Sequence, residues 1–167
     1  MSRDKTSLRQ NLVSARLNMS AQEVQARSRA IANQLIRNVD WANIGRMHIY
    51  SSVTKWNEVQ TDPIAEYVRR QWPTIKVIRP LIKAGQLLPN QKFDLIIVPC
   101  LGFDEELYRL GLGGGFYDRF LVNQPKALKI GLCFANGFIK DGLPDEPHDI
   151  PLDVIVTEED IIKAHDS

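Results

Sequence analysis

The chain has 167 residues, of which 44% are hydrophobic and 25% are charged, and these values are ordinary for a globular protein with a substantial core. Its formal net charge of +1 provides no global field that would attract nucleic acid or a membrane surface. No apolar run approaches membrane length, and the N-terminus lacks the apolar core of a signal peptide. We therefore expect one domain over residues 1–167, located in the cytoplasm, with no nucleic-acid partner and no membrane partner.

The first part of the chain predicts two helices. Residues 5–18 place Leu8 and Leu12 on one apolar stripe. A capping box at residues 20–23 then opens a second helix, which runs to about Asn38. On the first helix, three basic residues fall near a common face, and their spacing alone favours a solvated basic surface. These residues are Lys5, Arg9 and Arg16.

Short apolar runs then predict the strands of a mostly parallel sheet. The expected strands cover residues 47–51, 75–78, 94–99, 128–134 and 154–156. Asp62 is expected to cap a helix that has Pro63 at its first position and ends near Gln71. Another helix is expected over residues 116–122, and the acids at 158–159 predict a terminal helix. This order predicts an α/β fold with helices on both faces of the sheet and a ligand at the carboxyl ends of the strands.

Three reactive side chains are interpreted as structural. Cys100 and Cys133 lie in or beside apolar runs, and their spacing fits neither a disulfide framework nor a zinc site, so we expect buried, reduced thiols. His48 alternates with apolar neighbours in the first strand, and we expect its ring to be hydrogen-bonded or to lie at an edge.

Residues 109–120, R-L-G-L-G-G-G-F-Y-D-R-F, form the most informative stretch, because four of five consecutive positions are glycine. Glycine permits positive φ and a close approach of the backbone to a ligand. The N–H groups of such a turn, with the first turn of the following helix, suit a phosphate group, and Asp118 could hold magnesium against it. The alternative is a glycine turn without a ligand, but the entropy cost of ordering residues 113–115 then has no visible compensation. The standard phosphate-binding motifs do not match.

At this point the chain resembles the 5-formyltetrahydrofolate cyclo-ligase family, also called methenyltetrahydrofolate synthetase. The similar segments are D-L-I-I-V-P at 94–99, G-F-D at 102–104, R-L-G-L-G-G-G-F-Y-D-R at 109–119, E-P-H-D-I-P-L-D at 146–153, V-T-E at 156–158 and K-T-S-L-R at 5–9. The resemblance implies a three-layer αβα sandwich of the CoA-transferase-like type, which agrees with the α/β pattern above.

The resemblance also implies a magnesium- and ATP-dependent ligase that forms a C–N bond, cyclising 5-formyltetrahydrofolate to 5,10-methenyltetrahydrofolate with release of ADP and phosphate. Phosphorylation converts the formyl oxygen into a good leaving group, and the neighbouring amine then closes the ring. Such catalysis rests on positioning and charge neutralisation, which suits basic side chains, glycines and carboxylates with no obvious nucleophile. The implied partners are ATP and a reduced folate, bound by a monomer or a weak homodimer.

Pattern and resemblance together suggest the site residues. Those expected at the nucleotide are Lys5, Arg9, Arg109, Gly111, Gly113, Gly114, Gly115, Phe116 and Tyr117, with Lys5 and Arg109 as catalytic residues. Those expected at the folate are Ser51, Glu58, Gly113, Gly114, Gly115 and Phe116. Asp118 and Asp149 are expected to bind magnesium, with Asp153 as the substitute for Asp149. The resemblance gives Arg16 no role, and Trp56 is interpreted as covering the core edge rather than stacking on a pterin.

The chain departs from the family pattern in the segment 81–93, which is short and lacks an extra strand implied to line the folate pocket. Gln60 and Cys100 also stand where the family usually has Asp and Gly. Two alternatives therefore remain open. One is an ATP-binding relative that acts on another formylated or carboxylated small molecule, and the other is a nucleotide- or folate-binding module without catalysis.

Overall fold

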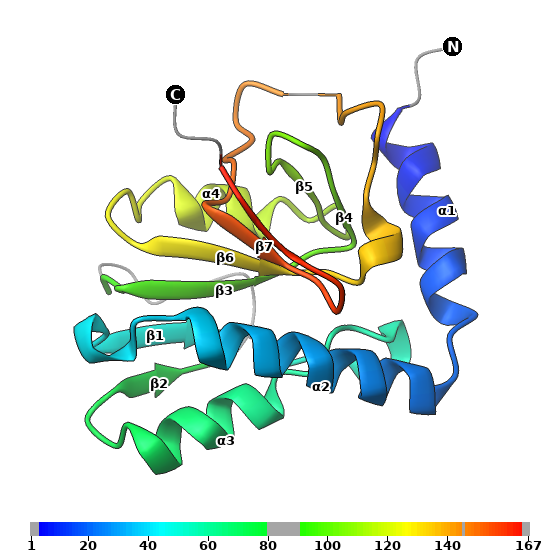
Figure 1. Cartoon of the computed structure of the whole chain (residues 1–167). Helices are drawn as coiled ribbons and strands as arrows, with labels where there is room; N and C mark the ends of the chain where they lie inside the picture. Colours follow the sequence, from blue (N-terminus) through cyan, green and yellow to red (C-terminus); the bar gives the residue numbers. More distant parts are fainter. Residues whose placement is uncertain (1–3, 80–90, 145, 165–167) are drawn as a thin grey trace.

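The computed structural model describes residues 4–79, 91–144 and 146–164 (Figure 1). Its helices are α1 Lys5–Leu17, α2 Ala21–Asn38, α3 Asp62–Gln71 and α4 Phe116–Leu121, with single 3-10 turns at Trp41–Asn43, Thr54–Trp56 and Ala135–Gly137. Its strands are β1 Arg46–Ile49, β2 Lys76–Ile78, β3 Leu95–Pro99, β4 Gly102–Phe103, β5 Arg109–Leu110, β6 Leu128–Leu132, β7 Val154–Val156 and β8 Ile161–Lys163. Most of the short segment 81–93 lies outside the described residues, and so does the wall of the folate pocket that this segment was expected to affect.

The central sheet has the strand order β2-β1-β3-β6-β7-β8, and every pair in it is parallel except β7 with β8. Ile97 of β3 pairs with Ile49 of β1 on one side and with Ile130 of β6 on the other. The first four residues of β3 are fully buried, as expected for a central parallel strand that is covered on both faces. The predicted mostly parallel α/β sheet is confirmed.

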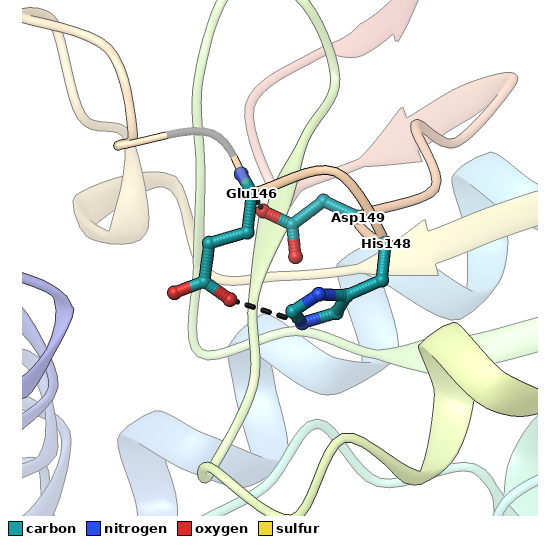
Figure 2. Close-up of side chains that lie close together, drawn as sticks. All are labelled: Glu146, His148 and Asp149. Atoms are coloured by element: carbon teal, nitrogen blue, oxygen red, sulfur yellow. Dashed lines mark hydrogen bonds and ion pairs between the residues drawn. The ribbon is translucent and has the colours of Figure 1, made fainter.

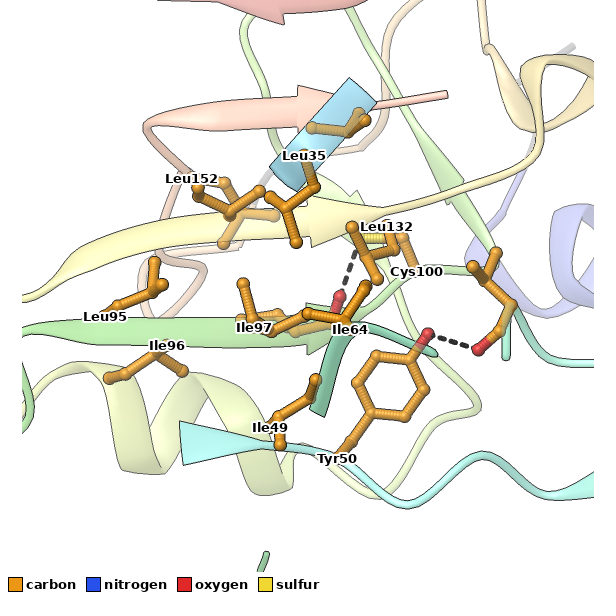
Figure 3. Close-up of a cluster of buried hydrophobic side chains, with 14 of the residues drawn as sticks. Leu35, Ile49, Tyr50, Ile64, Leu95, Ile96, Ile97, Cys100, Leu132 and Leu152 are labelled. Atoms are coloured by element: carbon orange, nitrogen blue, oxygen red, sulfur yellow. Dashed lines mark hydrogen bonds between the residues drawn. The ribbon is translucent and has the colours of Figure 1, made fainter. Parts of the chain in front are cut away.

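Helices cover both faces of this sheet, which confirms the three-layer arrangement. In Figure 1, α2 crosses in front of the strands and α4 lies behind them. One buried cluster joins Leu35 of α2 and Ile64 of α3 to Ile49, Ile97 and Leu132 of the sheet (Figure 3). Because each such side chain contributes about 1.5–3 kcal/mol when it is fully buried, this cluster fixes the helices against the strands. No helix among the described residues is long and apolar enough to cross a membrane.

The helix boundaries follow local capping chemistry. The predicted capping box of α2 is present: Ser20 Oγ accepts from the Glu23 amide, and the Glu23 carboxylate accepts from the Ser20 amide. The expectation that Asp62 caps α3 is wrong by one residue, since α3 begins at Asp62 and Thr61 occupies the capping position without a side-chain bond. The Asp62 carboxylate instead accepts from Arg79 Nη2 at 2.7 Å, beyond the end of β2.

The predicted terminal helix is also wrong, because β8 follows instead, antiparallel to β7. Thr157 reverses the chain: its Oγ1 accepts from the amides of Glu159 and Asp160, and its own amide donates to the Asp160 carbonyl. The Glu158 carboxylate points back and accepts from the Ala135 amide at 2.9 Å. The β-branched pair 161–162 then extends the sheet, so the local preference of two acids for a helix start is overridden.

A small antiparallel hairpin of β4 and β5 lies between β3 and the glycine stretch and was not predicted. Asp104 shapes its loop, because its carboxylate accepts from the amides of Glu106, Tyr108 and Leu143. This hairpin carries Arg109 to the end of the sheet where β3 finishes.

His48 contradicts its sequence interpretation. Its strand β1 lies between β2 and β3, its side chain is buried, and neither ring nitrogen has a hydrogen-bond partner in the described part of the chain. The rings of Phe93, Tyr117 and Phe120 surround it at centroid distances of 5.5, 5.9 and 5.0 Å. Burial lowers the pKa of His48 to about 4, so the ring is neutral near pH 7.

The cysteine expectation is confirmed, because Cys100 and Cys133 are buried free thiols. Burial raises the pKa of Cys100 to about 12 and that of Cys133 well above its usual value. Neither thiol is therefore an activated nucleophile.

Candidate active site

A pocket of about 390 Å³ lies at the carboxyl ends of β1 and β3, where ligands bind in open parallel sheets. Apart from the substitute metal ligand Asp153, all of the residues suggested from the sequence for the nucleotide, the folate and the metal line it: Lys5, Arg9, Ser51, Glu58, Arg109, Gly111, Gly113, Gly114, Gly115, Phe116, Tyr117, Asp118 and Asp149. They come from distant parts of the chain, and the fold brings them to one cavity.

Helix α1 supplies one wall of the pocket. Lys5, Arg9 and Arg16, which the helical spacing puts near one face, all line the cavity instead of forming a solvated surface. The helix is held beside the hairpin by Leu8, which packs with Leu110 of β5 in a small separate cluster. Arg9 also holds the glycine loop directly, because its Nε donates to the Gly111 carbonyl at 3.0 Å.

The glycine loop presents unused amides to the pocket. Gly113 and Gly115 have φ values of +107° and +63°, as expected for glycines that make a turn ahead of a helix. Gly114 faces open space, since a Cβ built on it would meet no atom within 4 Å. No hydrogen bond in the described part of the chain uses the amides of these three residues. Helix α4 has six residues, so the loop amides, rather than a helix dipole, provide the anion-binding potential.

Arg109 lies beneath this loop with its side chain 5% exposed. Its Nη2 is 3.6 Å from Asp118 Oδ2, and its guanidinium carbon is 5.3 Å from the centre of the Tyr117 ring. Its Nε is buried without a partner among the described residues. The other Asp118 oxygen accepts a long bond of 3.5 Å from the Ile150 amide. Arg109 therefore keeps donor capacity that no acceptor among the described residues satisfies.

Three potential metal ligands cluster at the rim of the pocket: Glu146, His148 and Asp149 (Figure 2). One ligand atom from each lies within 4.8 Å of the others. Lys5 Nζ is 2.6 Å from Asp149 Oδ2 and 3.6 Å from Glu146 Oε2, and His148 Nε2 is 3.0 Å from the same Glu146 oxygen. The ammonium group of Lys5 thus lies beside Asp149, where a metal ion bound by Asp149 would also lie.

The three-residue cluster does not include Asp118, the other predicted metal ligand. Asp118 lines the same pocket and reaches the segment after Asp149 through the Ile150 amide. Asp153, the predicted substitute, accepts from the Lys129 amide at 2.8 Å and does not line the pocket, which favours Asp149.

The opposite end of the pocket is built by the 3-10 turn at Thr54–Trp56. Glu58 Oε2 accepts from the Val53 amide at 2.7 Å, and burial raises the pKa of this carboxyl group. Tyr50 is buried beside it, and its hydroxyl donates to the Val59 carbonyl at 2.8 Å (Figure 3). Trp56 also lines the cavity.

The sequence left several lining residues without a site role: Arg16, Tyr50, Val53, Trp56, Cys100, Glu146 and His148. Two signals could have pointed to some of them. Arg16 shares a helical face with Lys5 and Arg9, and Glu146 and His148 belong to the motif that contains Asp149. Val53 and Tyr50 carry no such signal, because their positions depend on the path of the chain after β1.

Comparison with known proteins decides the family. A family model described as the 5-formyltetrahydrofolate cyclo-ligase family matches residues 1–87 and 72–158. The chain belongs to this family. Among curated members, it is 39% identical over 85 residues to the 5-formyltetrahydrofolate cyclo-ligase of Escherichia coli K12, covering 50% of this chain and 46% of that protein. It is 39% identical over 72 residues to the Mycoplasma pneumoniae cyclo-ligase, covering 42% of each. The chain thus spans about half the length of the curated cyclo-ligases that it matches.

Solved structures extend the likeness of fold over nearly the whole chain. A 5,10-methenyltetrahydrofolate synthetase from Aquifex aeolicus superposes with a TM-score of 0.80 at 25% identity, covering 98% of this chain and 94% of that one. The synthetase from Mycoplasma pneumoniae gives a TM-score of 0.80 at 24% identity, covering 93% and 99%. The α/β architecture of the cyclo-ligase family is therefore present here.

Proposed function

We propose that this protein is a ligase that uses ATP to cyclise 5-formyltetrahydrofolate to 5,10-methenyltetrahydrofolate. One observation carries the proposal: a single pocket combines the unused amides of the glycine loop and three basic side chains at one end with a half-buried carboxylate and aromatic rings at the other. The first end has the chemistry of a phosphate site, and the second has that of a site for a flat polar ring. Membership of the cyclo-ligase family supports this division.

In the proposed reaction, the formyl oxygen attacks the terminal phosphorus of ATP, a P–O bond of ATP breaks, and ADP leaves. The amine at the 10-position then attacks the activated formyl carbon and loses its proton. The C–O bond to the phosphate breaks, phosphate departs, and the new C–N bond completes the five-membered ring. Because negative charge spreads over the transferring group, donors fixed in advance accelerate the transfer.

The residues at the phosphate end suit this task. We assign the amides of residues 113–115 to the oxygens of the transferring phosphoryl group. Lys5 and Arg109 would offset its charge as catalytic residues, and Arg9 would fix both the loop and the nucleotide. Phe116 and Tyr117 would pack between the nucleotide and the folate, and Ser51 and Glu58 would face the folate.

Magnesium fits the donor set at the rim, because carboxylate oxygens are the ligands that this ion prefers. Asp149 and Asp118 would hold it, and its charge would help to neutralise the phosphates. Lys5, which now pairs with Asp149, would be free to turn toward the phosphate oxygens.

The test is the absorbance of methenyltetrahydrofolate, followed with purified protein, ATP, magnesium and 5-formyltetrahydrofolate. We expect product formation that requires all three additions, and ATP hydrolysis that the folate stimulates. ATP hydrolysis that ignores the folate would point to a relative with another substrate. Binding of ATP or folate without phosphate release would instead show a non-catalytic module. Either outcome would refute the proposed function.

A further inference from the structure

Arg16 has an unusual environment for an arginine. It lies in the last turn of α1, is 7% exposed and lines the pocket. Its Nε and Nη2 are buried, and neither has a hydrogen-bond partner in the described part of the chain. A guanidinium group stays charged in proteins, and a buried charge without acceptors is unfavourable. This arrangement is expected where a ligand supplies the missing acceptor.

Glu58 is the acidic side chain that interacts electrostatically with Arg16. Glu58 lowers the energy of the guanidinium electrostatically, but among the described residues no ion pair joins the two side chains. The Glu58 carboxylate is fixed by the Val53 amide at 2.7 Å. Asn57, the residue before Glu58, clamps the end of α1 by donating from Nδ2 to the carbonyls of Arg16 and Met19. The pocket therefore presents a guanidinium donor and a carboxylate acceptor, each with unused hydrogen-bonding capacity.

A ligand that satisfies both groups must carry an acceptor next to donors. The 2-amino-4-oxopyrimidine edge of a reduced pterin has this pattern: the 4-oxo group accepts, and the N3–H and 2-amino groups donate. Tyr50 and Trp56 line the same end of the cavity and can contact the faces of a flat ring. The glutamate tail of a folate would also attract an arginine, but such a charged tail remains hydrated, whereas Arg16 is buried.

We propose that Arg16 is a specificity-determining residue that donates to the 4-oxo group of the pterin while Glu58 accepts from its N3–H and 2-amino groups. The inference rests on the proposed function, because it takes the folate as the ligand. It adds the residue that recognises the 4-oxo group of the ring.

The experiment changes the residue at position 16 and the group at position 4 of the ligand, separately and together. Binding of 5-formyltetrahydrofolate and of its analogue with a 4-amino group in place of the 4-oxo group is measured by calorimetry, and turnover of both is measured with ATP. The proteins are the wild type, Arg16→Met, Arg16→Lys and the control Arg37→Met, which removes an exposed arginine on α2. A hydrogen bond from a charged donor corresponds to roughly 10–100-fold in affinity.

We expect the wild type and Arg37→Met to prefer the 4-oxo ligand by about 10–100-fold. Arg16→Met should lose most of this preference, through Kd and KM rather than kcat, and Arg16→Lys should retain part of it. Because an effect on folding alone would weaken both ligands equally, an unchanged ratio in Arg16→Met would overturn the inference. If Arg16→Met does not fold, a full wild-type preference in Arg16→Lys has the same consequence.

The two proposals fail separately. A wild-type protein that binds the folate with the expected preference but forms no methenyl product refutes the proposed function and keeps the role of Arg16. Normal product formation with no dependence of the ligand preference on Arg16 refutes the inference alone. Absence of any folate binding to the wild type refutes both.

Discussion

Acid should destabilise this protein through the buried residue His48. The unfolded chain has the ordinary histidine pKa of 6.5, and burial lowers the folded value to about 4. Above pH 6.5 the ring is neutral in both states, so the stability is fully present there. As the pH falls from 6.5 to 4, the unfolded chain takes up a proton that the folded protein cannot accept, so the free energy of unfolding falls across this interval.

The size of the effect follows from the two pKa values. One pKa unit corresponds to about 1.4 kcal/mol, so the full loss by pH 4 is about 3 kcal/mol, and about 2 kcal/mol of it appears by pH 5. The aromatic rings of Phe93, Tyr117 and Phe120 around His48 provide no acceptor that would reduce this penalty. For a protein of ordinary stability, such a loss is a substantial fraction of the total.

The assay is urea unfolding at several pH values between 7.5 and 4.5 for the wild type and His48→Leu. The variant removes two unsatisfied nitrogens, so at pH 7.5 its stability should lie within about 1 kcal/mol of the wild type. At pH 5 it should exceed the wild type by about 2 kcal/mol more than at pH 7.5. Parallel curves for the wild type and His48→Leu would show that His48 titrates normally, which would refute the reasoning.

Four further predictions concern the phosphate end of the pocket. Gly114→Ala should leave stability within about 0.5 kcal/mol, because its Cβ meets open space, yet weaken ATP binding at least tenfold by calorimetry. Gly113→Ala should lose about 1–3 kcal/mol in urea unfolding because of its φ of +107°, and equal stability of the two variants would contradict this geometry. Asp118→Asn should abolish magnesium-dependent ATP turnover while the circular dichroism spectrum is retained; turnover at the normal rate would remove Asp118 from the metal assignment. Lys5→Met should reduce kcat/KM for ATP by roughly 10–100-fold, and a value equal to that of Arg37→Met would show that Lys5 does not contact the nucleotide.

The sheet and its helices could be predicted because their signals are local and strong. Apolar runs such as residues 94–99 show buried parallel strands directly, and the capping box at Ser20 fixes the start of α2. The hairpin of β4 and β5 could not be predicted, since strands of two residues are too short to show a period. At the C-terminus, the acids at 158–159 carried a helix signal, and the turn chemistry of Thr157 overrode it.

The location of the candidate site was predictable for a different reason. Motifs that are far apart in sequence follow neighbouring parallel strands or precede the sheet, and parallel topology brings strand ends to one edge. The hydrogen-bond and ion-pair partners of each side chain were not predictable. Whether His48 finds a hydrogen-bond partner, or whether Lys5 pairs with Asp149, depends on which loops close over it, and residue spacing contains no such information.

Helix α1 gives the pocket its length as well as its charge. Lys5 stands in its first turn and Arg16 in its last, so the two cations are separated by roughly 16 Å along the helix axis. They also differ in state, because Lys5 already pairs with Asp149 whereas Arg16 has two buried nitrogens without partners. An incoming anion at the first turn therefore exchanges one ion pair for another, at little cost in desolvation. A neutral ring at the last turn instead satisfies donors that are already dehydrated. Because one rigid helix holds both groups, the phosphoryl group and the ring would be positioned relative to each other before either is bound.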